Sequence, residues 1–106
     1  MFINLTPHEV TILDKKNCVV KSIPPSGTVA RLVTDVKDKG FIEGVRITKT
    51  DFYSIDGLPP FEKGTYLIVS QMVKNSYLSV SRNDLLVPTD IVRENGKILG
   101  CRALGA

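Results

Sequence analysis

The sequence predicts a mainly β fold: a compact antiparallel β-sandwich or small barrel with one short helix, in a single domain over residues 1–106. Short apolar and β-branched runs recur along the chain, and clusters of Gly, Pro, Asn and Asp separate them. One segment alone has the apolar spacing and the cap of a helix. A chain of 106 residues is of ordinary length for one domain and can bury one small core.

The first third of the chain predicts a hairpin followed by a stiff corner. Strands are expected over residues 10–13 and 18–23, with the polar segment 14–17 as the turn between them. Pro24-Pro25-Ser26-Gly27 ends this hairpin, because two prolines fix φ and remove two N–H donors while the glycine permits the turn. Extended structure then resumes over residues 28–34.

The middle of the chain predicts further short strands. The charged segment 35–40 has no clear period, so we expect a loop there. Strands are expected over 41–42 and 45–52, with Glu43-Gly44 as a bend between them. Segment 56–60 is rich in proline and glycine and predicts a second loop.

The single helix should follow the most buried strand. Residues 66–70 are apolar on both faces, which is typical of a central strand. The helix is expected over residues 70–77, with Ser70 as its N-cap and with Val73 and Tyr77 on one face at a spacing of four.

The last third predicts a strand over 85–87 that ends at Pro88, and then a hairpin. Asn95-Gly96 between two apolar runs is the strongest short-range hairpin signal in the chain. A two-residue turn there pairs Glu94 with Lys97, Arg93 with Ile98 and Val92 with Leu99. This register puts Ile91, Arg93, Ile98 and Arg102 on one face, and Val92, Leu99, Cys101 and Ala103 on the core side.

Composition narrows the class of function. The net charge of +3 slightly favours anionic partners, but the chain lacks the dense basic stripe of nucleic-acid binders. The apolar runs are far shorter than the roughly 20 residues that span a bilayer, and no signal peptide is readable, so we expect a cytoplasmic protein without membrane contact. Cys18, Cys101 and the single histidine cannot complete a zinc site without carboxylates, and we expect no metal or cofactor.

Two surfaces are candidates for binding an anionic ligand. At the proline corner, Ser26 and Thr28 offer hydroxyl groups and turn N–H donors, with Arg31 close behind. The alternative there is a plain structural corner with Arg31 in solvent. In the carboxy-terminal hairpin, Arg93 and Arg102 on one face suit a planar anion or the carboxylates of a protein. The alternative there is a solubilising outer face.

Other residues support different functions. Tyr53 or Tyr77 is expected to stack on a nucleotide-like ligand. One alternative function is a small β-barrel that binds nucleic acid, with Phe52-Tyr53 near basic residues as its best aromatic cluster. A second alternative is a small hydrolase that uses His8, whose imidazole would need a nucleophile in reach and a group to orient it.

Several segments together form a distinctive pattern: Leu5-Thr6-Pro7-His8, Ile23-Pro24-Pro25-Ser26-Gly27-Thr28-Val29-Ala30-Arg31, Arg82-Asn83-Asp84-Leu85-Leu86-Val87-Pro88 and Gly100-Cys101-Arg102. Over nearly its whole length, the chain resembles a largely uncharacterised family of small bacterial and phage proteins. The resemblance implies no reaction, cofactor or catalytic residue. It implies a non-enzymatic phage or prophage accessory protein, with counter-defence as the expected role, that binds an anionic nucleotide-like ligand or a host protein. A homo-oligomer is the expected assembly.

Overall fold

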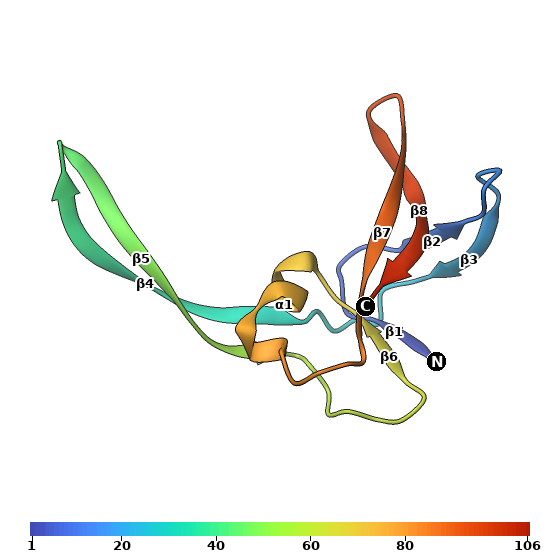
Figure 1. The fold of residues 1–106 in the computed structure, drawn as a ribbon, viewed down its shortest axis with the longest axis horizontal. Helices are drawn as coiled ribbons and strands as arrows, with labels where there is room; N and C mark the ends of the chain where they lie inside the picture. The colour runs from blue at the N-terminus through green and yellow to red at the C-terminus, as the bar shows by residue number, and fades with distance from the viewer.

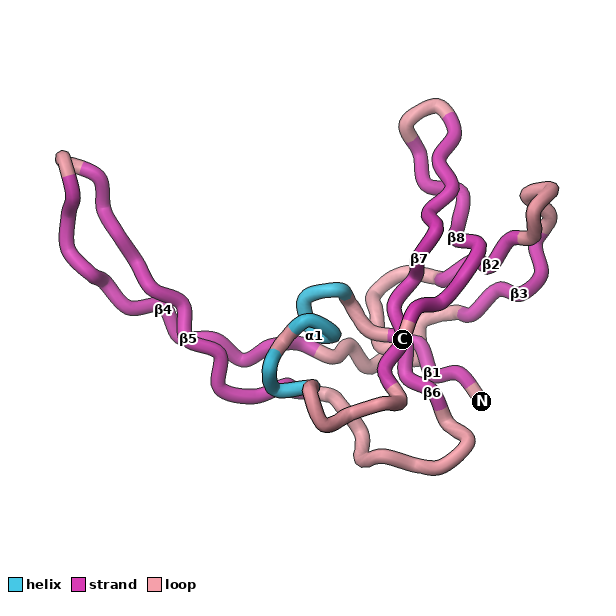
Figure 2. Tube along the Cα trace, viewed as in Figure 1, coloured by secondary structure: helices cyan, strands magenta, loops and turns pink.

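The computed structural model describes residues 1–106, apart from the side chain of Tyr77. Strands dominate it, with one short α-helix and one 3-10 turn (Figures 1 and 2). In chain order the elements are β1 (Phe2–Asn4), β2 (Val10–Leu13), β3 (Val19–Ile23), β4 (Arg31–Ile42), β5 (Val45–Asp56), β6 (Tyr66–Ile68), α1 (Gln71–Asn75), η1 (Tyr77–Ser79), β7 (Leu85–Glu94) and β8 (Lys97–Gly105). The predicted fold class, mainly β with one short helix, is confirmed.

Six strands form a sheet that curls into a nearly closed barrel, in the order β1-β6-β7-β8-β2-β3. Its two edges meet at Asn4, whose Nδ2 donates a hydrogen bond to the carbonyl oxygen of Ile23 at 3.0 Å. The expected antiparallel pairing holds for β2 with β3 and for β7 with β8. The pairs β1·β6, β6·β7 and β2·β8 are parallel, so the sheet is mixed. Segment 69–84, which contains α1 and η1, is the crossover that the parallel β6·β7 pair needs.

The core lies between β6, β7 and α1. Ile68 and Val69 are fully buried, which confirms the prediction of a central strand, although the β6 ladder ends at Ile68. Helix α1 is shorter than predicted, because Ser76 leaves the helical region with ψ of 140°. Its predicted cap is confirmed, since Ser70 Oγ accepts a hydrogen bond from the Val73 N–H. The main cluster of buried residues comprises Leu5, Ala30, Leu67, Val69, Val73, Leu85 and Val87.

Strands β4 and β5 pair only with each other and form a long two-stranded arm that projects from the barrel (Figure 1). The prediction of a loop over 35–40 is wrong, because these residues lie within β4 and those from Asp35 to Asp38 pair with β5. Asp38 also receives a side-chain hydrogen bond from Arg46 Nε at 2.6 Å. The predicted bend at Glu43-Gly44 closes the arm. The radius of gyration is 17.0 Å, against about 13 Å for a globular chain of this length, so the arm stands clear of the compact body.

The carboxy-terminal hairpin departs from its predicted register at one residue. Strand β7 runs on through Pro88, which lies beyond the last residue paired with β6 and therefore borders a free edge. The turn at Asn95-Gly96 and the pairs Glu94–Lys97 and Arg93–Ile98 are confirmed. The predicted pair Val92–Leu99 is wrong, because Val92 pairs with Gly100 and Leu99 is the extra residue of a bulge.

The bulge at Leu99 changes which residues share a face. Beyond it, Ile91 pairs with Cys101, so Cys101 lies on the same face as Ile91, Arg93 and Ile98. Arg102 therefore lies on the opposite face, and the predicted grouping of Arg93 with Arg102 is wrong. A one-residue shift of register exchanges the two faces of a strand, and here the bulge produces that shift along part of β8 only.

Candidate functional site

An apolar groove with a cavity volume of about 300 Å³ lies on the concave side of the β7–β8 hairpin. Its walls are β7, β8, the start of β2 and the start of α1. The residues that line it are Thr6, His8, Glu9, Val10, Thr11, Val69, Ser70, Gln71, Val87, Pro88, Ile91, Ile98, Gly100 and Cys101. The polar residues come from the loop over 6–9, from Thr11 on β2 and from the beginning of α1. An apolar hollow with a few polar groups at its border is the usual form of a binding site.

The groove depends on the close approach of β8 to β2. Gly100 permits it, because a Cβ at this position would lie 2.5 Å from the carbonyl oxygen of Thr11. Cys101 is buried next to this contact, and its thiol points to the same carbonyl oxygen at 3.7 Å. Burial raises the pKa of the Cys101 thiol, so the group stays protonated at neutral pH and is a poor nucleophile.

Asn4 fixes the loop that carries His8. Its Nδ2 donates a hydrogen bond to the carbonyl oxygen of His8 at 2.8 Å, and its Oδ1 accepts two from Thr6, from N–H at 3.0 Å and from Oγ1 at 2.6 Å. His8 is exposed at the groove, and its imidazole has no hydrogen-bond partner among the described side chains. Ser70 also lines the groove, but its hydroxyl oxygen caps α1.

Three of the donors predicted at the proline corner are already engaged within the chain. The Ser26 N–H donates to the carbonyl oxygen of Asn4 at 3.0 Å, and the Thr28 N–H points to Ser26 Oγ at 3.4 Å. The Ser26 hydroxyl donates to the carbonyl oxygen of Thr28 at 3.2 Å. Arg31 is exposed at the base of the arm and lines a different hollow from that of Ser26 and Thr28. The Ser26 N–H, the Ser26 hydroxyl and the Thr28 N–H are thus engaged within the chain, and Arg31 lies at a different hollow.

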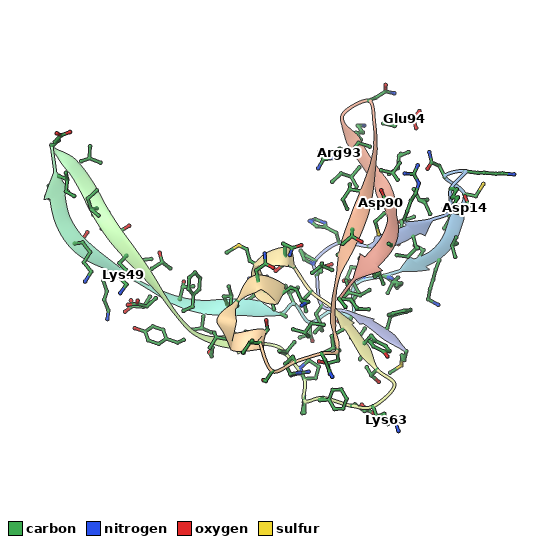
Figure 3. All side chains as sticks on the ribbon, in the orientation of Figure 1. Asp14, Lys49, Lys63, Asp90, Arg93 and Glu94 are labelled. Carbon is green, nitrogen blue, oxygen red and sulfur yellow. The ribbon has the colours of Figure 1, made fainter. Side chains whose placement is uncertain are left out.

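The remaining predicted site residues lie on separate surfaces. Arg93 lies near the outer end of the β7–β8 hairpin, on the groove face beside Ile98 (Figure 3). Arg102 lies on the other face, where its Nη2 donates to Asn17 Oδ1 at 2.8 Å. One chain therefore does not bring these two arginines together with Arg31.

Of the two tyrosines expected to stack on a ligand, Tyr53 lies on β5 in the arm. Its hydroxyl donates a hydrogen bond to Asp35 Oδ2 at 3.4 Å, and partial desolvation together with the charges of Asp35 and Asp51 raises the pKa of Tyr53. The side chain of Tyr77 lies outside the described part of the chain.

Sequence reasoning missed the groove itself. It grouped Ile91 with Ile98 on one face of the hairpin, which is correct, but it placed that face on the outside. The curl of the sheet makes this face concave. The segments that close the groove, β2 and the start of α1, are distant in sequence from the hairpin. The available signal was the spacing of two between Ile91 and Arg93, which predicts that they share a face of the strand. It carries no information on the curvature of the sheet.

Among the described residues, no group of three or more His, Cys, Asp or Glu side chains could hold a metal ion. The described helices are all too short to cross a membrane. Comparisons with protein-family models, with curated proteins and with solved structures found no match.

Proposed function

We propose that this chain is a non-enzymatic binding protein, and that the groove between the β7–β8 hairpin and α1 receives an apolar group of its partner. The observation that carries the proposal is the uncovered apolar wall of the groove. Ile98 is 62% exposed and Ile91 is 41% exposed, although both lie on a concave face. Covering apolar surface contributes about 25 cal/mol per Å² to binding, so a partner that covers this wall gains binding free energy.

Of the two expected kinds of partner, the geometry favours a protein over an anionic nucleotide-like ligand. Glu9 is the charged residue that lines the groove among the described residues, apart from the titratable His8, and a carboxylate repels an anion. The N–H donors of Ser26 and Thr28 are engaged within the chain. A protein can supply an apolar side chain for the groove and carboxylates for the nearby Arg93.

The resemblance to phage and bacterial proteins supplies the context of this proposal. A phage or prophage accessory protein that counters host defence would act in the host cytoplasm, and its partner would then be a host protein. Binding is favoured over hydrolysis at His8 because the groove offers Cys101 as a protonated thiol and Ser70 as a helix cap. The nucleic-acid alternative gains less support, because Arg46 and Lys49 on the arm already contact Asp38 and Asp51.

Replacing Ile98 by glutamate should weaken binding in the groove at least tenfold, because a buried aliphatic side chain is worth about 1.5–3 kcal/mol. The measurement is a titration of the ¹⁵N-labelled protein with indole as an apolar probe and with cyclic AMP as an anionic probe. We expect indole to shift the amide signals of β7 and β8 around the groove.

The matched control is Val19→Glu, since Val19 is 63% exposed on a strand outside the groove. It should leave the affinity for indole within twofold. Equal effects of the two substitutions would remove the groove as the binding site. Shifts by cyclic AMP at Ser26, Thr28 and Arg31, without shifts by indole, would instead favour the anionic ligand.

A further inference from the structure

The outer end of the arm is apolar and uncovered. Phe41, Ile42 and Val45, which flank the Glu43-Gly44 turn and are called the arm tip below, are 73%, 64% and 61% exposed. They lie at the far end of a two-stranded ribbon that leaves the barrel and reaches no other strand (Figure 1). A ribbon of two strands is marginally stable by itself in water. Three large apolar side chains at its free end therefore indicate a surface that is covered when the protein is assembled.

The sides of the arm are protected against pairing with a further strand, and the tip is not. Lysines stand along both strands, at Lys37 and Lys39 on β4 and at Lys49 on β5, and a bulge between Asp38 and Phe41 interrupts the regular edge. Charged residues and bulges on free strands are the usual protection against edge-to-edge association. Contact is thus expected through the end of the arm, by insertion into a hollow.

The groove of the same chain matches the arm tip in polarity and in charge. Its wall is apolar, and Arg93 stands on the groove face in direct register with Ile98. Glu43 stands at the turn of the arm, and neither Glu43 nor Arg93 has an ion-pair partner among the described side chains. A second pair of opposite charges is present. Lys39 near the tip also has no ion-pair partner among the described side chains, and Glu9 lines the groove.

We propose that the arm tip of one copy docks into the groove of a second copy of this chain, with Glu43 against Arg93 of the second copy. The proposal rests on the proposed function, because the arm tip of a second copy would occupy the same groove in place of a host protein. The end of the arm and the β7–β8 hairpin that lines the groove lie on separate parts of one chain (Figure 1). Each copy can therefore give a tip to one neighbour and accept a tip from another. Such head-to-tail contacts build a ring or a filament.

Charge exchange tests the pairing of Glu43 with Arg93. Light scattering after size-exclusion chromatography over a range of concentrations should show that Glu43→Arg and Arg93→Glu each weaken self-association about tenfold, as close charge pairs at interfaces do. The double variant should restore most of the loss. Glu62→Arg, at an exposed turn outside the groove and the arm, is the matched control and should leave the association unchanged. A wild-type protein that stays monomeric at millimolar concentration would overturn the proposal.

A mixed disulfide tests the contact directly. Two variants are prepared in a Cys18→Ser background, one with Phe41→Cys and one with Ile98→Cys. Oxidation should crosslink a mixture of the two chains and neither chain alone. Crosslinking of Phe41→Cys alone would mean that tip meets tip, and absence of a crosslink in the mixture would also refute docking in the groove. If either of these crosslinking results is found and the wild-type groove still binds indole, the self-docking proposal fails while the proposed function stands. If the Ile98→Glu variant keeps both indole binding and self-association, the proposed function fails as well.

Discussion

Replacing Asn4 by aspartate is expected to destabilise the fold by about 3–5 kcal/mol at neutral pH, the usual effect of an uncompensated buried charge. Asn4 is 1% exposed, and its Nδ2 donates hydrogen bonds to the carbonyl oxygens of His8 and Ile23 at 2.8 and 3.0 Å. Aspartate removes both donors and sets a charged oxygen against two carbonyl oxygens. Because the bond to Ile23 joins the two edges of the barrel, urea unfolding followed by circular dichroism should show the loss of stability as a lower midpoint.

The pH dependence of the Asn4→Asp variant gives a second readout. Burial and the two facing carbonyl groups should raise the pKa of the new carboxyl group above the value of about 3.9 for an unfolded aspartate. The folded variant then binds a proton more readily than the unfolded chain, so its deficit relative to the wild type should shrink as the pH falls towards 4.

Asn75→Asp is the control for the Asn4 substitution, because Asn75 is exposed and its Oδ1 already acts as an acceptor. It should change the stability by no more than about 0.5 kcal/mol. A deficit of Asn4→Asp that matched this control, or that grew at acid pH, would contradict the role given to Asn4.

The features that the sequence predicted correctly depend on neighbours along the chain. The turn at Asn95-Gly96 needs only residues that tolerate a positive φ, and Asn95 has a φ of 52° and Gly96 one of 78°. The cap at Ser70 needs an N–H three residues further on. An apolar run in the sequence predicts the central strand over 66–70. For the same reason, the mainly β class could be predicted from the recurrence of short strands and turns.

The features that the sequence did not predict depend on distant partners. Segment 35–40 becomes a strand because β5 supplies partners for Asp35 to Asp38, as Thr48 does for Asp38. The bulge at Leu99 leaves no local signature, yet it separates Arg93 from Arg102. The donors at the proline corner looked free, but the carbonyl oxygen of Asn4, 22 residues earlier, takes one of them. The predicted site residues do not meet within one chain, because Ser26 and Arg102 bond to residues elsewhere in the chain while Arg31 and Arg93 lie on separate surfaces.

Replacing Asp84 by asparagine is expected to destabilise the protein by about 3 kcal/mol at pH 7, and this deficit should shrink below about pH 4. Asp84 is 2% exposed and accepts two hydrogen bonds from Arg82, whose Nη2 also donates to the carbonyl oxygen of Pro59 at 2.9 Å. Asparagine leaves this largely buried guanidinium group without a counter-charge.

The pH dependence follows from the same contact. The hydrogen bonds from Arg82 lower the pKa of Asp84, so the unfolded chain binds a proton at a higher pH than the folded protein does. The stabilisation by the pair is therefore complete above the unfolded pKa and is lost as the pH falls through the folded one. Urea midpoints of the wild type and Asp84→Asn between pH 7 and pH 2 measure it, with Asp56→Asn at an exposed strand end as the control. A difference between wild type and Asp84→Asn that stayed constant down to pH 2 would mean that the charge of Asp84 contributes nothing, and that packing of the loops around Pro59 and Arg82 accounts for the whole effect.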